Sequence, residues 1–212
     1  AVTEFLDMEL RPLFTEMVAR KVEMPEFEEY LHARHAEERN QQIAKINPDM
    51  PDGGSGMDTA DAKTYLEALT PEKRRAYEAL AKRVDAINVK TRQDIIAYGL
   101  ESPDTIRAWE AAYQNYVPLH REDMEDGPGI GQGYSVRGPA SKRATGSKRT
   151  VVDILANVAM QRERVVVRGE KNRVANALIG LATENPNPDF WKVDKPPVLK
   201  VVNDRTGLVE ER

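Results

Sequence analysis

Two histidines stand close together, with acidic residues at helical spacing on either side. Glu29 precedes His32 by three residues, and His35 lies between His32 and Glu38 at the same spacing, so the four side chains fall on neighbouring helical turns. Imidazole and carboxylate groups bind metals, which makes His32 and His35 candidates for a metal-dependent enzyme site. The sequence has neither a second Glu-x-x-His nor His-Glu-x-x-His, the patterns of two-metal bundles and zinc proteases. His35 also continues the apolar line through Leu31, so we expect a packed, hydrogen-bonded histidine and no metal or other cofactor.

The glycine-rich stretch Gly127–Gly133 is a second feature that could do chemistry, because glycine loops cradle phosphates. No register of this stretch gives G-x-G-x-x-G, and no apolar strand precedes it. Farther on, Thr145–Thr150 resembles the end of a Walker loop, but Ser141 stands where its first glycine belongs and Ser147 precedes Lys148. We therefore expect no nucleotide site and interpret the glycines as allowing close packing against another backbone.

A run of basic residues follows these glycines without an intervening acid. It consists of Arg137, Lys142, Arg143, Lys148 and Arg149. Such a run can neutralise phosphates in a sequence-independent way, or it can dock onto acidic protein surface. Aromatic residues for base stacking are nearly absent, with only Tyr134 nearby. The pattern favours protein contact through these five residues and leaves nucleic-acid binding as the alternative.

The distribution of charge along the chain is uneven. The net charge is −4, from 31 basic and 35 acidic residues. The stretch from Val136 to Ala175 holds ten basic residues against three acidic ones, whereas the rest of the chain holds 21 against 32. One segment therefore carries a positive excess and the remainder a negative one, which indicates an anionic partner or docking between oppositely charged surfaces.

The composition restricts the class of protein. Among the 212 residues there is no cysteine, which excludes disulfides, thiolate chemistry and cysteine zinc sites. No apolar run approaches the roughly 18 residues that span a bilayer, so we expect no membrane span. Aromatic residues make up only 6%, and the apolar content is carried by Ala, Leu, Ile, Val and Met, a mixture that favours helices.

Local signals place the helices that must position these residues. Pro12 predicts a helix start or a kink, and Pro25 and Asn47-Pro48 bound a second helix. A loop follows at 49–58, and then a short helix from roughly Thr59 to Leu69. Helices then start at Thr70-Pro71 and Ser102-Pro103, with Gly99 as a C-terminal cap between them. An apolar stripe from Ile106 through Trp109 and Tyr113 predicts that the last of these helices continues to Tyr116.

The second half changes character. Residues 121–149 lack periodicity, Thr150–Asp153 predicts the start of a long helix, and Val165–Gly169 leaves a break in that helix open. The end of the chain predicts a hairpin with strands at Val198–Val202 and Leu208-Val209. We therefore expect a mainly α fold: an irregular helical bundle with a long glycine-rich basic arm and a small C-terminal β-hairpin. Its parts are a helical part (1–116), the arm (117–149), a long helix (150–185), and a linker with the hairpin (186–212).

Six short motifs occur in a distinctive order between about residues 27 and 195. They are Leu31–Asn40 (LHARHAEERN), Ser55–Met57 (SGM), Tyr116–Leu119 (YVPL), Lys142–Gly146 (KRATG), Glu170–Arg173 (EKNR) and Asn185–Trp191 (NPNPDFW). In this combination the chain resembles a helical region of the large polyvalent proteins of tailed phages and related mobile elements.

The resemblance implies a segment between other domains of a giant virion-associated protein, of a kind that can be ejected into the cell with the DNA. Such proteins can carry polymerase, methylase, helicase, protease or toxin domains, and none of those signatures is present. The resemblance supplies no catalytic residues. We therefore expect a non-enzymatic structural or interaction module in the virion, with delivery to the host cytoplasm as an option. Its expected partners are other domains of the same polypeptide or other virion proteins, with DNA and a second copy as further candidates.

Overall fold

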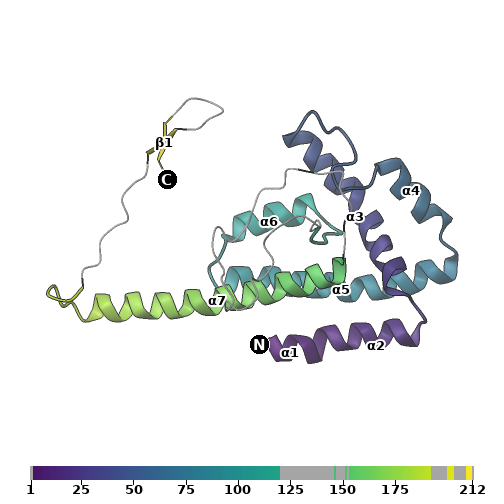
Figure 1. The fold of residues 1–212 in the computed structure, drawn as a ribbon. Coiled ribbons are helices and arrows are strands. Elements are labelled where there is room, and N and C mark those ends of the chain that lie inside the picture. Colours follow the sequence, from purple (N-terminus) through teal and green to yellow (C-terminus); the bar gives the residue numbers. More distant parts are fainter. Residues whose placement is uncertain are drawn as a thin grey trace, which may run out of the picture. The chain divides into compact units, whose positions relative to one another are not determined.

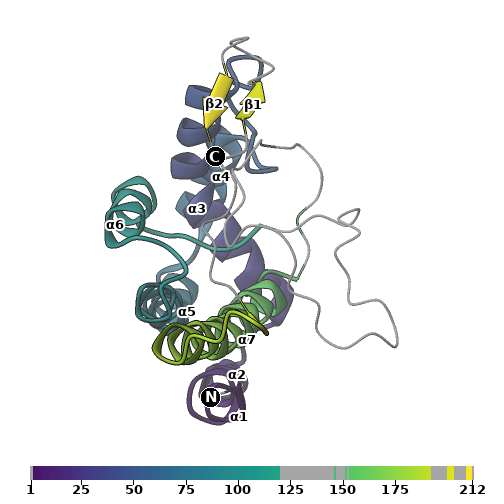
Figure 2. The same cartoon turned by 90° about the vertical axis from the view of Figure 1, so that its left-hand side faces the viewer.

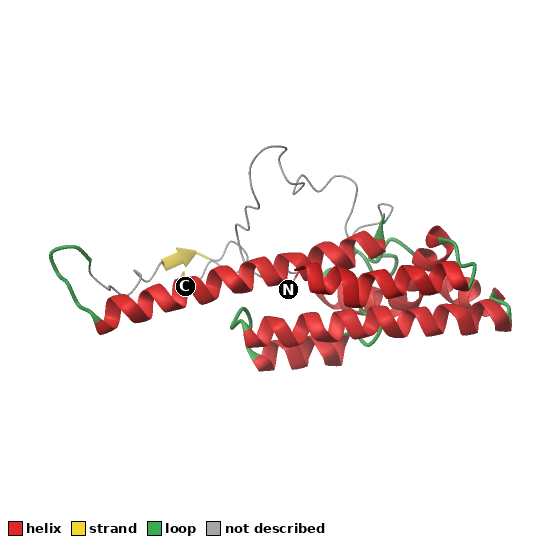
Figure 3. Ribbon diagram, turned by 90° about the horizontal axis from the view of Figure 1, so that it is seen from below, coloured by secondary structure: helices red, strands yellow, loops and turns green. Residues whose placement is uncertain are grey.

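The computed structural model describes residues 2–119, 146, 151, 153–191, 200–202 and 209–211. Within these ranges the fold is mainly α, as predicted (Figure 3). The chain divides into two units, Ala1–Asn172 and Arg173–Arg212, and the boundary falls within one long helix. In the described part, none of the helices is long and apolar enough to cross a membrane.

The N-terminal helix passes through Pro12 without starting there. It runs as α1 (Val2–Phe5), a π-helical stretch η1 (Leu6–Leu10) and α2 (Arg11–Ala19). The N–H of Arg11 donates to the carbonyl of Leu6, which is the longer reach of a π turn. Because Pro12 has no N–H to donate to the preceding turn, a local π turn just before it keeps the helix continuous.

Helix α3 spans Met24–Ile46, α4 Thr59–Ala68, α5 Pro71–Ala97 and α6 Pro103–Ala112. Helices α3, α4 and α5 begin and end close to where the sequence predicts, and α6 begins at its predicted start. The hydroxyls of Thr70 and Ser102 accept hydrogen bonds from backbone N–H groups three residues on, at 3.3 and 3.1 Å. Gly99 adopts a left-handed φ of 65° just after α5, as a C-terminal glycine cap does.

The prediction for the end of α6 is wrong. The helix stops at Ala112, and Tyr113 is extended, with φ of −138° and ψ of 108°. Pro118 disfavours a helical backbone at Val117, so the chain beyond Tyr116 does not extend the helix. Tyr113 and Tyr116 therefore leave the expected helical stripe and contact α3 instead.

Helix α7 (Ile154–Glu184) runs without the break left open at Val165–Gly169. It begins later than the predicted cap at Thr150, a residue outside the described ones. A side chain from another helix takes the place of that cap: the carboxylate of Glu28 accepts a hydrogen bond from the N–H of Leu155 at 2.9 Å. Burial raises the pKa of Glu28, although this hydrogen bond opposes the rise.

The main hydrophobic core of the first unit is built by four helices, and the described residues form two smaller clusters beside it. Figures 1 and 2 show α2, α5 and the start of α7 running along a common direction while α3 crosses them. Each of these helices contributes fully buried side chains to the core, including Leu13, Phe27, Leu80 and Val158. Val117 and Val151, which flank the arm, pack in the same core, so the core fixes α3 relative to both of them.

Gly169, in the middle of α7, explains how that helix packs against the end of α5. A Cβ on Gly169 would lie 2.2 Å from the ring of Tyr98, so only glycine leaves room for that ring. The Tyr98 hydroxyl donates to Glu170 at 3.0 Å, and the amide of Asn172 donates to the Tyr98 carbonyl at 2.7 Å. The glycine that weakens the helix in sequence is therefore a packing requirement.

In the second unit, α7 continues to Glu184 with large exposed apolar side chains such as Val174 and Leu178. Strands β1 (Lys200–Val202) and β2 (Val209–Glu211) pair antiparallel, with Val201 opposite Glu210. The predicted turn at 203–207 lies outside the described residues, so the hairpin as a whole stays a prediction.

Candidate functional site

The residues that lead into the arm are held by one carboxylate of α3. We call residues 113–117 the arm root. The Glu38 carboxylate accepts hydrogen bonds from the backbone N–H groups of Gln114 and Asn115, at 2.8 and 2.9 Å. These bonds to a charged acceptor are stronger than those between neutral groups, so Glu38 holds the chain where α6 ends.

His35 connects this carboxylate to the aromatic side chains of the arm root. It is fully buried, and its Nδ1 lies 2.8 Å from Glu38 Oε1. Because a carboxylate can only accept, Nδ1 carries the proton and Nε2 holds the lone pair. The imidazole packs against the rings of Tyr113 and Tyr116, with ring centroids 5.5 and 5.7 Å away. Within the described ranges Nε2 has no hydrogen-bond partner, and burial lowers the pKa of His35.

A positively charged side chain of α3 also contacts Tyr113. The Arg39 guanidinium lies 5.8 Å from the centroid of the Tyr113 ring and donates to its hydroxyl at 3.3 Å. A cation over an aromatic ring is attracted by the electron-rich face of that ring. Arg39 and His35 thus hold the same tyrosine from adjacent turns of α3.

Two further helices hold Tyr116. The side-chain amide of Asn88, in α5, donates to the Tyr116 carbonyl at 2.7 Å, and Gln161, in α7, donates to its hydroxyl at 3.2 Å. Burial raises the pKa of Tyr116, so the phenol stays neutral. Val117 follows and is buried in the core. The arm root is therefore fixed by α3, α5 and α7 together.

The other end of the arm contacts the same helix. Gly146 has a left-handed φ of 77°, and a Cβ there would lie 2.6 Å from Ile43 Cγ2 and 2.8 Å from the sulfur of Met50. Only glycine fits both the backbone conformation and this space. Val151 also packs against the core. Gly146 thus packs closely against two side chains, whereas the stretch Gly127–Gly133, predicted to pack against another backbone, lies outside the described residues.

A buried asparagine, Asn40, fixes the loop between α3 and α4, and this loop contacts Gly146. Asn40 is 2% exposed, and its amide nitrogen lies within 3.0 Å of three acceptors, on Asp52, Met57 and Thr59. Its side-chain oxygen accepts from the N–H of Ser55 at 2.7 Å. This loop carries Met50, one of the two side chains that seat Gly146.

The sequence candidates for metal binding serve the fold in this arrangement. His32 Nε2 lies 3.0 Å from the Ser55 carbonyl oxygen, and His35 Nδ1 is held by Glu38. Across the described ranges, no three His, Cys, Asp or Glu side chains are grouped so that they could hold a metal ion. The prediction that His35 is packed and hydrogen-bonded is confirmed, and we identify neither histidine as a metal ligand.

The five basic residues predicted as contacts lie outside the described residues: Arg137, Lys142, Arg143, Lys148 and Arg149. What the structure adds is their anchored neighbours: the arm root and Gly146 enclose the first three, and Gly146 and Val151 enclose the last two. Sequence reasoning missed the roles of Asn40, Tyr113 and Tyr116. Pro118 disfavours a helix only at Val117, so no local signal marks the end of α6 at Ala112 or the roles of the two tyrosines.

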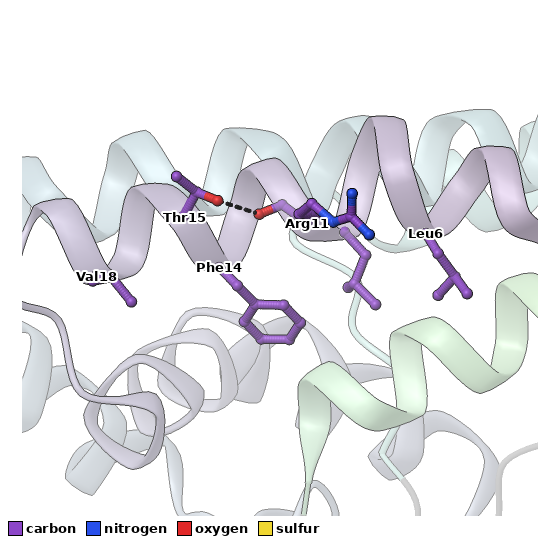
Figure 4. A pocket seen from close by; sticks show the side chains of 6 residues that line it. Leu6, Arg11, Phe14, Thr15 and Val18 are labelled. Atoms are coloured by element: carbon purple, nitrogen blue, oxygen red, sulfur yellow. Dashed lines mark hydrogen bonds between the residues drawn. The ribbon is translucent and has the colours of Figure 1, made fainter.

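A surface groove of about 550 Å³ lies along the N-terminal helix (Figure 4). Leu6, Leu10, Phe14 and Val18 line it at a spacing of four residues, with Arg11 at its side. The Arg11 guanidinium pairs with Asp7 at 2.9 Å, and the hydroxyl of Thr15 donates to the Arg11 carbonyl. The lining contains no histidine or carboxylate, so it offers no acid–base group for catalysis.

No family model, curated protein or solved structure matches this chain. The resemblance to polyvalent proteins therefore rests on its short motifs. Several of those motifs meet in the structure: Leu31–Asn40 supplies His35 and Glu38, and Tyr116 and Gly146 pack beside the same helix.

Proposed function

We propose that this chain is a non-catalytic structural and interaction module that docks through its basic arm (117–149). The observation that carries the proposal is the pair of anchors on α3. Glu38 holds the backbone before the arm, and Ile43 seats Gly146 near its end. A segment with both ends fixed loses less conformational freedom when it binds than a free tail would, which favours its use as a contact.

The chemistry around the anchors supports a non-catalytic role. The Glu38 carboxylate accepts hydrogen bonds from His35 and from two backbone amides, and His35 Nε2 is buried against aromatic rings. A general base must reach the proton of a substrate, and these groups are committed to holding the chain.

The six motifs that resemble those of polyvalent proteins support a proposal about the larger protein in which this module occurs. We propose that it belongs to a large virion-associated protein, which can accompany the DNA into the host cytoplasm. Its docking partners are then other domains of that polypeptide or other virion proteins. Several residues of these motifs act as anchors, so the motifs coincide with the contacts that hold the two ends of the arm.

The alternative is sequence-independent nucleic-acid binding, favoured by the five arm cations that no acid interrupts. The negative excess elsewhere in the chain repels phosphate and favours protein contact instead. The two functions differ in their response to salt. Five phosphate contacts would give a slope of log K against log salt of roughly −4 to −5.

We expect the chain to show no binding to a short mixed-sequence DNA duplex at physiological salt, measured by fluorescence anisotropy. Steep, salt-sensitive binding that disappears when Arg137, Lys142, Arg143, Lys148 and Arg149 become Gln would establish the nucleic-acid alternative. The matched control replaces five exposed cations of the helical body, Arg11, Lys45, Arg75, Lys82 and Arg107, with Gln. Equal loss of DNA binding in both variants would indicate nonspecific attraction rather than an arm site.

A further inference from the structure

The two ring nitrogens of His35 differ in their surroundings, and the proposed docking function does not explain this difference. The Nδ1–H of His35 already donates to Glu38, so any further proton must go to Nε2. Nε2 is buried and finds no acceptor among the residues that the structure describes. A proton there creates a buried charge and an unsatisfied donor at once, and both are costly.

The charged and titratable groups around His35 come from several elements. From α3 they are Arg34, Glu38 and Arg39; from the arm root, Tyr113 and Tyr116; and from α5, Asp85 and Arg92. Helix α7 contributes the neutral amide of Gln161 to Tyr116. Arg34 is neutralised by Asp85, and Arg92 by Glu110 at 3.0 Å. Glu38 alone favours a second proton on His35, and its carboxylate is shared with two backbone amides.

We propose that His35 and Glu38 form a pH-sensitive latch, which holds the arm root on α3 while His35 is neutral and releases it when Nε2 takes up a proton from solvent. Protonation is relieved by moving the imidazole away from the two tyrosine rings and toward water. That movement also withdraws Glu38 from the amides of Gln114 and Asn115. The inference holds whether the arm contacts protein or DNA, so it does not depend on the proposed function.

The direction of the pH effect follows from burial. Because burial lowers the pKa of His35 in the folded protein below its ordinary value of 6.5, the closed latch binds this proton less readily than the open one. The closed latch is therefore most stable above pH 6.5 and loses stability as the pH falls below that value. One proton changes the ratio of open to closed by up to about tenfold for each pH unit.

Amide hydrogen exchange of the whole chain between pH 8 and pH 5 tests the latch, with rates corrected for the pH dependence of intrinsic exchange. We expect the protection of Gln114 and Asn115 to fall by up to about tenfold per pH unit below pH 6.5, and to level off near the lower pH at which the NMR signal of the His35 imidazole titrates. The amide of Asn47, bonded to the Ile43 carbonyl at the end of α3, is the internal reference. Its protection should not follow that titration.

His35→Gln removes the titrating group, and its arm root should show no such dependence on pH. Three results would overturn the latch: His35 titrating without loss of protection at Gln114 and Asn115, protection that rises on protonation, or the same pH dependence in H35Q. The titration of the unaltered protein decides between the first two even if H35Q does not fold.

Discussion

Gly169→Ala lowers the free energy of unfolding by about 2 kcal/mol or more, even though alanine is the better helix former by about 1 kcal/mol. The added methyl group would lie 2.2 Å from two atoms of the Tyr98 ring. The ring cannot simply rotate away, because its hydroxyl bonds to Glu170 and its backbone carbonyl to Asn172. Relief of the overlap must therefore separate α5 from α7. Urea unfolding followed by circular dichroism measures the change.

Gly180 provides the matched control in the same helix. A Cβ at Gly180 has no atom within 4 Å, so Gly180→Ala meets no obstacle. This substitution should leave stability unchanged or raise it by up to about 1 kcal/mol. If both substitutions stabilise the protein, Tyr98 does not pack against α7 as described here.

Asn40→Ala costs about 3 kcal/mol or more and releases the loop between α3 and α4. The substitution leaves the N–H of Ser55 without its acceptor and removes the donor shared by Asp52, Met57 and Thr59. Met57 and Asp52 keep bonds from Ser55 and Thr59, so the cost comes from the buried bond lost at the Ser55 N–H, about 1–3 kcal/mol, together with the cavity that the side chain leaves. The loss of stability is again measured by urea unfolding, and hydrogen exchange at Ser55 shows whether the loop opens first.

Asn176→Ala is the comparison for this second prediction. Asn176 is exposed on α7, and alanine has the higher helix propensity, so stability should change by no more than a few tenths of a kcal/mol. A small cost for Asn40→Ala, equal to that of Asn176→Ala, would mean that the loop is held by its apolar contacts alone.

The helices were predictable wherever a local signal determines the structure. Thr70-Pro71 and Ser102-Pro103 combine a capping hydroxyl with a first-turn proline, and both start helices where expected. Gly99 ends α5 for a local reason as well, because a left-handed residue there favours glycine. The mainly α class follows from such signals added along the chain.

Contacts between distant segments could not be predicted. The cap that Glu28 provides for α7 joins residues far apart in sequence, and no motif near Leu155 announces it. Tyr113 fits a helical stripe, yet its aromatic contact with His35 and the end of α6 at Ala112 give it an extended backbone. Tertiary packing overrides local periodicity at such positions.

The charge asymmetry is also refined by the structure. Arg162 counts toward the positive excess of the second half, but it is 4% exposed and pairs with Asp94 of α5. Its charge therefore serves the packing of α7 rather than an external partner. Most of the remaining positive excess belongs to the sequence of the arm, where the docking proposal places its contacts.

Chemical cross-linking between lysine amines in the natural full-length polypeptide tests the docking proposal most directly. Lys142 and Lys148 report on the arm, and the exposed Lys45 and Lys82 report on the helical body. Docking through the arm predicts that Lys142 and Lys148 cross-link to protein outside residues 1–212 much more often than the two control lysines. Equal cross-linking of all four lysines, or attachment of the arm to DNA alone, would contradict it.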